Sequence, residues 1–138
     1  MQTHTNPKVE KIRNVPLFAG LSKRGLNRLA LIADEVDLPE HTELTREGER
    51  GREFFVLLDG RAEVRKDGRK ISSLGKGDFL GEIALVTGFP RTATVTTTSP
   101  VRALVINDRD FATLLKDSQQ VRKGIIRAVG TRLARELS

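Results

Sequence analysis

Gly81, Glu82 and Arg91 lie close together in the middle of the chain, and their types and spacing could bind an anion. Gly81 precedes a run of good helix formers, residues 82–86 (EIALV), that is long enough for about one helical turn. The first amides of a helix have no partner inside the helix, and together with the helix dipole they favour an anion. An arginine nearby adds a planar fork of N–H donors that matches phosphate oxygens. The pattern therefore predicts a phosphate site.

Glu82 suggests a second contact with the same ligand. An acid beside an anion is unfavourable unless it accepts a hydrogen bond from a neutral donor, such as a sugar hydroxyl. A phosphate and a sugar hydroxyl bound within one loop indicate a nucleotide. The competing explanations are structural: Arg91 could be a surface arginine paired with an acid, and Glu82 could serve only the start of the helix.

This stretch, residues 77–95, resembles the phosphate-binding cassette of the cyclic-nucleotide-binding domain family. The family pattern is Gly-Glu-apolar-Ala-Leu, a short spacer, and then Arg-Thr/Ser/Ala-Ala before a strand. Here it reads Gly81-Glu82-Ile83-Ala84-Leu85 and Arg91-Thr92-Ala93. The resemblance also includes residues 16–22, 48–49 and 54–60, so it covers almost the whole chain. It is a resemblance to domains of the kind found in catabolite activator protein and in the regulatory subunit of protein kinase A.

The resemblance implies cAMP or cGMP as the ligand, with cAMP the favoured expectation, and it implies seven ligand-binding residues. Arg91 would bind the phosphate, and Glu82 would accept from the ribose 2′-hydroxyl. The others would contribute backbone groups, a hydroxyl or the pocket wall: Gly81, Ile83, Ala84, Thr92 and Ala93. The family often covers the base with a group from its C-terminal helix. This chain has no Trp or Tyr and no Phe after Phe111, so Arg127 and Leu133 are the candidates for covering the base.

Composition limits the class of protein. With 138 residues the chain is long enough for one domain with one real core. It has no cysteine, which excludes a disulfide framework and suits the cytoplasm. The start of the chain lacks the apolar segment of a secretory signal, and no apolar run approaches the ~20 residues of a membrane span. His4 and His41 are the only histidines, so we expect neither a metal nor a cupin-like enzyme.

The order of elements predicts a mainly β fold, an eight-stranded antiparallel jelly roll or β-roll flanked by helices. Residues 1–8 are expected to be disordered and residues 9–33 to form N-terminal helices, with Ser22 as an N-cap. Residues 35–106 alternate with a period of two and would form the β-roll. Asp59-Gly60 and Asp67-Gly68 each predict a hairpin. Residues 107–138 would form two C-terminal helices, capped by Asn107 or Asp108 and by Ser118.

The sequence does not decide which surface the last predicted helix packs against. Its apolar stripe, Ile126, Val129, Leu133 and Leu137 with Val121 and Ile125 beside it, could pack on its own barrel or on a second copy in a homodimer.

We interpret the chain as a stand-alone, non-catalytic cyclic-nucleotide receptor whose C-terminal helices respond to ligand. The alternatives are the sensor fragment of a larger regulator that acts on an unknown effector protein, and a basic nucleic-acid-binding protein. The net charge of +6 supports non-specific nucleic-acid binding. Specific binding is not expected, because no helix-turn-helix follows the long helix.

Overall fold

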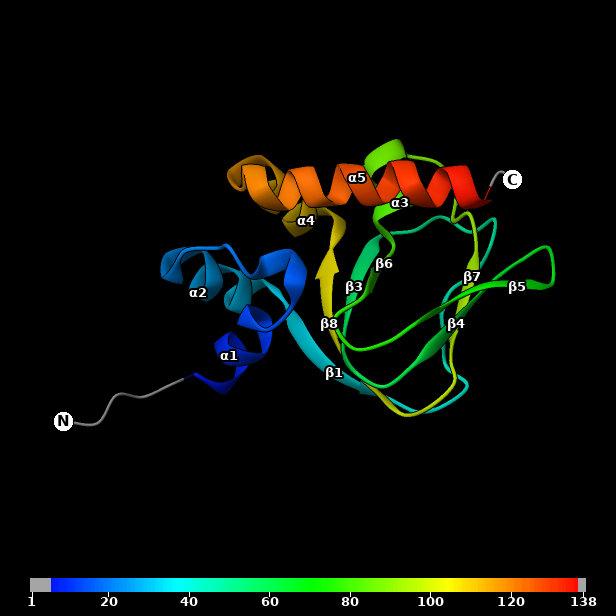
Figure 1. The fold of residues 1–138 in the computed structure, drawn as a ribbon, viewed down its shortest axis with the longest axis horizontal. Helices are drawn as coiled ribbons and strands as arrows, with labels where there is room; N and C mark the ends of the chain where they lie inside the picture. Colours follow the sequence, from blue (N-terminus) through cyan, green and yellow to red (C-terminus); the bar gives the residue numbers. More distant parts are fainter. Residues whose placement is uncertain (1–5, 137–138) are drawn as a thin grey trace.

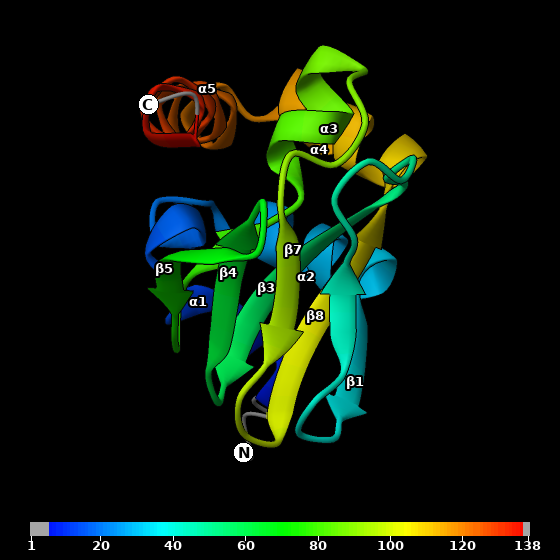
Figure 2. The same ribbon diagram turned by 90° about the vertical axis from the view of Figure 1, so that its right-hand side faces the viewer.

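A computed structural model describes residues 6–136 of the chain and contains two four-stranded antiparallel sheets (Figures 1 and 2). One sheet has the order β1-β8-β3-β6, and the other has the order β2-β7-β4-β5. The strands are β1 (Asp34–Leu38), β2 (Glu43–Thr45), β3 (Glu53–Asp59), β4 (Ala62–Lys66), β5 (Arg69–Leu74), β6 (Phe79–Leu80), β7 (Thr94–Thr97) and β8 (Val101–Asn107). This arrangement confirms the predicted β-roll with flanking helices.

The helices precede, interrupt and follow the strands. They are α1 (Pro7–Arg13), the 3₁₀ turn η1 (Pro16–Phe18), α2 (Lys23–Ile32), α3 (Glu82–Thr87), α4 (Asp108–Asp117) and α5 (Gln119–Glu136). In Figure 1, α5 runs across one end of the molecule beside α3 and α4, and α1 and α2 lie lower on one side. The short helix of the cassette and the C-terminal helix are therefore neighbours, although they are far apart in the sequence.

Strand β3 explains why the core has two parts. Its residues Phe54, Val56 and Leu58 face a cluster shared with the helices, and that cluster includes Phe111 and Ile125. The alternate residues Phe55 and Leu57 face a second cluster, which includes Ala62, Val64 and Val95 of the other sheet. Because successive side chains point to opposite faces of a strand, a strand buried on both faces needs a continuous apolar run.

The prediction of a hairpin across Asp59-Gly60 was wrong. Strand β3 pairs with β6 and β8, whereas β4 pairs with β5 and β7, so this turn carries the chain from one sheet to the other. The reason is tertiary, because β3 must be buried on both faces and β4 on only one. The hairpin predicted across Asp67-Gly68 is confirmed: Lys66 pairs with Arg69, and both turn residues have positive φ.

The helix starts follow from their caps. Helix α1 begins at Pro7 and not at Val9, since the Asn6 side chain accepts a hydrogen bond from the Lys8 amide at 2.9 Å and Pro7 suits the first position. Residues 1–5 of the segment predicted to be disordered lie outside the described residues. The capping roles of Ser22, Asn107 and Ser118 are confirmed, because each side-chain oxygen accepts from an amide three residues later.

Helix α5 packs its apolar stripe on its own domain. Val121, Ile125 and Val129 are buried, whereas Ile126 is 57% exposed, so the predicted stripe was wrong at that position. Leu137, which the stripe also included, lies outside the described residues. Residues four apart share a helix face, and the face that contains Val121, Ile125 and Val129 meets the helical cluster.

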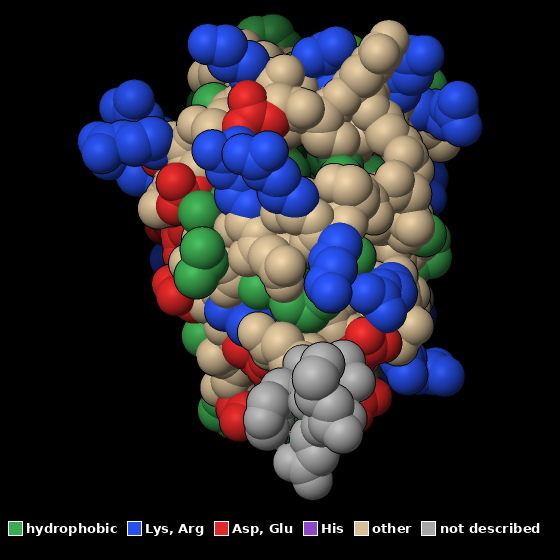
Figure 3. Space-filling view, turned by 90° about the vertical axis from the view of Figure 1, so that its left-hand side faces the viewer, with side chains coloured by type: hydrophobic (Ala, Val, Ile, Leu, Met, Phe, Trp, Pro, Cys, Tyr) green, Lys and Arg blue, Asp and Glu red, His purple; other side chains and the backbone are tan. Residues whose placement is uncertain are grey.

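The positive charge is not gathered into one patch on the face shown in Figure 3. Lys and Arg side chains stand there in several separate groups, with Asp and Glu among them. Several cations of the described chain are paired with neighbouring acids, as in the Arg13–Glu10 and Arg28–Asp117 pairs. Mixed charge of this kind is typical of a solvated surface.

Candidate functional site

Two glycines bracket the short helix α3. Gly81 is its N-cap with φ +97°, and a Cβ there would lie 2.5 Å from the Glu53 carbonyl oxygen and 2.8 Å from Arg91 Nη1. Gly88 ends the helix with φ +76° and donates to the Ala84 carbonyl. Both positions need the left-handed conformation that glycine adopts without steric cost. The first turn of α3 is thereby brought close to Arg91.

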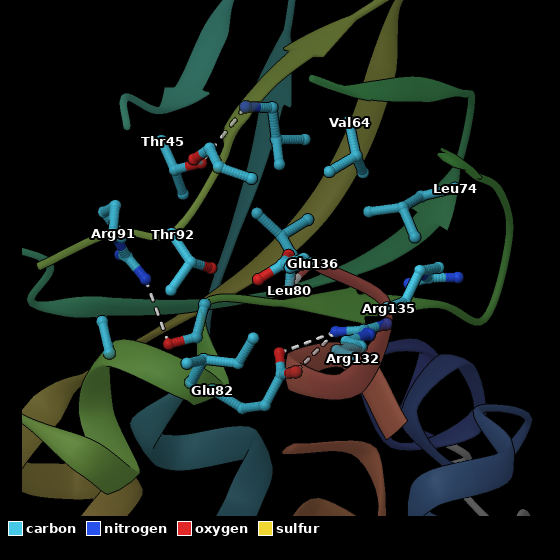
Figure 4. Close-up of a pocket in the computed structure, with 15 residues that line it drawn as sticks. Thr45, Val64, Leu74, Leu80, Glu82, Arg91, Thr92, Arg132, Arg135 and Glu136 are labelled. Carbon is cyan, nitrogen blue, oxygen red and sulfur yellow. Dashed lines mark hydrogen bonds and ion pairs between the residues drawn. The ribbon is translucent and has the colours of Figure 1, made fainter. Parts of the chain in front are cut away.

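The seven predicted ligand-binding residues line one cavity (Figure 4). The remaining wall comes from strands of both sheets and from the end of α5. It consists of Thr45, Val64, Leu74, Leu80 and Val95, together with Arg132, Arg135 and Glu136. The volume is about 50 Å³, which is room for only a few water molecules. In this conformation the cavity is therefore too small for a nucleotide.

Arg91 is a buried cation with unused donors. Its side chain donates from Nη1 to the Gly81 carbonyl at 3.0 Å and from Nη2 to the Glu53 carbonyl at 2.7 Å, and the residue is only 7% exposed. Within residues 6–136 it forms no salt bridge, so the alternative of a surface arginine paired with an acid does not hold. A guanidinium has five N–H donors, and those left over have no protein partner in the described chain. Arg91 lines the cavity, so the side chain that carries these donors borders the space in which an anion would lie.

The environment of Arg91 also affects its proton equilibrium. Burial lowers the pKa of Arg91, and the nearby charges of Glu53 and Glu82 oppose that change. A guanidinium stays protonated under ordinary conditions, so the cavity keeps a positive charge. Gly51 packs directly against this side chain, since a Cβ at that position would lie 2.2 Å from Arg91 Nε.

Glu82 is also buried, but it is already paired. The residue is 1% exposed, and Arg132 of α5 donates from Nη1 to its two carboxylate oxygens at 2.7 and 2.8 Å. The Arg132 guanidinium also lies over the Phe79 ring, 4.8 Å from its centroid. Burial raises the pKa of Glu82, and the positive charge of Arg132 opposes the shift. The carboxylate expected to bind a sugar is thus in direct contact with the C-terminal helix.

Reasoning from the sequence missed the residues that α5 contributes. Arg127 is exposed and Leu133 packs against the helical cluster, and neither lines the cavity. The lining residues are Arg132, Arg135 and Glu136, whose spacings of three and four place them on one face of the helix. The signal that could have pointed to them is the buried acid Glu82, which requires a cation nearby.

Comparison with known proteins defines the class. The family model described as cyclic nucleotide-binding domain matches residues 35–118, and the chain belongs to that family. Among curated relatives, a cAMP-dependent protein kinase regulatory subunit from Mycosarcoma maydis is 36% identical over 116 residues, which cover 75% of this chain and 22% of the relative. A cyclic nucleotide-gated potassium channel from Rhizobium etli is 32% identical over 111 residues, covering 80% of this chain and 31% of the channel.

Solved structures agree with this assignment. The regulatory domain of Toxoplasma gondii protein kinase A, crystallised with cAMP, has a TM-score of 0.72 and 29% identity; the match covers 83% of this chain and 47% of that one. The regulatory subunit of a cAMP-independent protein kinase A from Trypanosoma brucei has a TM-score of 0.81 at 23% identity, covering 88% of this chain and 46% of that one. The second likeness shows the fold alone, so the ligand has to be argued from the site.

The chain spans about a quarter of the length of the curated relatives it matches. Across residues 6–136 there is no cluster of His, Cys, Asp and Glu suited to a metal ion. No helix in the described part of the chain combines the length and the apolar character needed to cross a bilayer.

Proposed function

We propose that this domain is a non-catalytic cyclic-nucleotide receptor that prefers cAMP to cGMP. The observation that carries the proposal is the cavity in which a buried Arg91 with free donors lies beside the start of α3 and the buried acid Glu82. A cation with unpaired N–H groups next to unpaired helix amides suits a phosphate. The preference for cAMP is supported by relatives whose names include cAMP-dependent kinase regulatory subunits.

In this proposal each part of the cavity contacts a different part of the ligand. The cyclic phosphate would lie against Arg91 and the backbone of Gly81, Ile83 and Ala84. The ribose 2′-hydroxyl would donate to Glu82, and the Thr92 hydroxyl and the methyl of Ala93 would border the phosphate. The base would occupy the part of the cavity lined by the apolar residues Val64 of β4, Leu74 of β5 and Leu80 of β6.

The ion pair between Glu82 and Arg132 would couple ligand binding to α5. A sugar hydroxyl that donates to Glu82 shares the carboxylate with Arg132, and the small cavity requires the end of α5 to move. A ligand shifts such an equilibrium only by binding one conformation more tightly than the other. Movement of α5 would thus transmit ligand binding to an effector. The effector would be either another region of the same protein or a separate protein. A homodimer through α5 stays a prediction. Ile126 is the exposed large apolar residue of α5 that would pack against the second copy.

Calorimetric titration with cAMP and with cGMP tests the proposal. We expect cAMP to bind more tightly than cGMP, and we expect hydrogen exchange of α5 to change when cAMP is added. AMP is the matched control, since it carries the same base and sugar without the cyclic diester. Absence of heat with both cyclic nucleotides at tens of micromolar, confirmed by unchanged hydrogen exchange, would contradict the proposed function.

A further inference from the structure

A groove of about 390 Å³ lies between strand β5 and the C-terminal half of helix α5. In Figures 1 and 2, β5 runs below this part of the helix. Ser72 and Ser73 line the groove on the strand side, and Arg127 and Arg135 line it on the helix side. The groove adjoins the nucleotide cavity, since Arg132 and Arg135 border both, but most of its wall belongs to the groove alone.

The helix side of the groove is positively charged. Arg127 and Arg135 are exposed, and within residues 6–136 neither forms a salt bridge. Among the described residues, Asp78 is the one acid on the wall of the groove, and its Oδ2 accepts from the Gly75 amide at 2.8 Å. The groove therefore presents two guanidinium groups without an acidic partner, and carboxylates match their planar fork of donors.

The strand side of the groove is the edge of a sheet. Strand β5 pairs with β4 alone, so its other edge carries N–H and C=O groups that no strand of the described chain satisfies. An extended peptide can add to such an edge, with main-chain hydrogen bonds for affinity and side-chain contacts for specificity. A strand that added to β5 would lie with one of its sides toward α5 and its arginines.

The charge of β5 indicates which strand would fit. The strand begins with Arg69 and Lys70, which are both exposed, and the nearest acid to Lys70 Nζ is Glu63 at 3.9 Å. Like charges on neighbouring strands are unfavourable and opposite charges are favourable. Two copies of this basic edge would therefore repel one another, whereas an acidic strand would meet cations along β5 and again on α5.

We propose that the groove between β5 and α5 binds an acidic, extended segment of a partner protein. The segment adds to the edge of β5 and places its carboxylates against Arg127 and Arg135. The groove is formed by α5 in the position that leaves the cavity too small for a nucleotide. The inference thus goes beyond the proposed function, and it is tested on the chain without nucleotide.

The test titrates the nucleotide-free chain with a short peptide in which Glu and Thr alternate, and follows the amide signals by NMR. We expect the signals of Ser72, Ser73 and Arg127 to shift, with a dissociation constant below about 1 mM. Replacing every Glu of the peptide by Gln should weaken binding about five- to tenfold, because exposed ion pairs are individually weak. Two adjacent prolines at the centre of the peptide should also weaken binding, because they remove a main-chain donor in either register.

Matched variants of the chain test the two arginines. Arg127→Ala combined with Arg135→Ala should weaken binding of the Glu peptide about five- to tenfold and leave binding of the Gln peptide unchanged. Lys123→Ala combined with Arg109→Ala is the control, because it removes the same charge from exposed positions outside the groove. This control should bind the Glu peptide within about twofold of the unmodified chain, since distant exposed charges are screened by salt.

Three results would overturn the inference. The Glu peptide could leave the signals of the groove unshifted at about 1 mM. The Arg127 and Arg135 double variant could bind it as tightly as the unmodified chain, so that the arginines take no part. A single-stranded DNA oligonucleotide of equal charge could bind the groove more tightly than the peptide, which would make the groove a nucleic-acid site. Each result would leave the proposed function intact, because Arg91 and Glu82 lie outside the groove.

Discussion

Replacing Arg132 by methionine should destabilise the domain by an amount that depends on pH. The change removes the cation that pairs with Glu82 and keeps an unbranched apolar stem over Phe79. Removing one partner of a buried ion pair costs about 3–5 kcal/mol, because the other charge is left uncompensated. The Glu82 side chain is 1% exposed and the Arg132 side chain is 17% exposed. Because Arg132 keeps some contact with water, we expect a loss of stability at the lower end of this range, about 3 kcal/mol. For a domain of this size that loss corresponds to a fall of roughly 10 °C in Tm.

The pH dependence follows from the pKa of Glu82. In the folded state burial raises this pKa above its usual value of 4.5, so between the unfolded and folded values the folded chain holds the extra proton. The free energy of unfolding therefore falls as pH rises through that window. Arg132 restrains the shift, and its removal raises the folded pKa of Glu82 further. The difference between Arg132→Met and the unmodified chain should be larger at pH 7.5 than at pH 5.

Urea unfolding at the two pH values measures both effects. Arg127→Met is the matched control, since Arg127 is exposed on the same helix and its replacement should change stability by no more than about 0.5 kcal/mol. The double variant Glu82→Gln with Arg132→Met should recover stability at pH 7.5 and lose the pH dependence of the pair. An equal loss for Arg132→Met at both pH values, or a loss no larger than that of the control, would refute the reasoning.

Four other substitutions test the site and the helices. Arg91→Ala should weaken cAMP binding by roughly ten- to a hundredfold in calorimetry, and an unchanged Kd would exclude Arg91 from the ligand contacts. Gly51→Ala should weaken binding without removing a charge, since its Cβ would displace the Arg91 guanidinium; Gly75→Ala, whose Cβ meets open space, is its control and should bind normally. Gly130→Ala should stabilise the domain by up to about 1 kcal/mol, because the position is helical and its Cβ also meets open space; a lower urea midpoint would contradict this. Asn107→Ala should cost about 1 kcal/mol through loss of the α4 cap, and a midpoint equal to that of the unmodified chain would show that the cap is dispensable.

Local chemistry accounts for what could be predicted from the sequence. Gly81 and Gly88 bracket α3, and Asp67-Gly68 turns a hairpin, because each position needs a backbone conformation that few residues adopt. The caps at Ser22 and Asn107 depend only on a side chain and an amide three residues away. The cassette is continuous in the chain, and its resemblance to the family grouped the seven residues before any long-range contact was known.

What only the tertiary structure decided depends on surfaces that are distant in the sequence. The Asp59-Gly60 turn has the same local signal as the second hairpin, but burial of β3 on both faces sends the next strand to the other sheet. Glu82 needed a cation, and the packing of α5 against α3 selected Arg132, fifty residues later, and not Arg127. The same packing brings Glu136 into the cavity. The residue types of the cassette therefore determine its chemistry. The position of α5 determines which charged side chains contact the cassette, because a helix presents only one face to its neighbour.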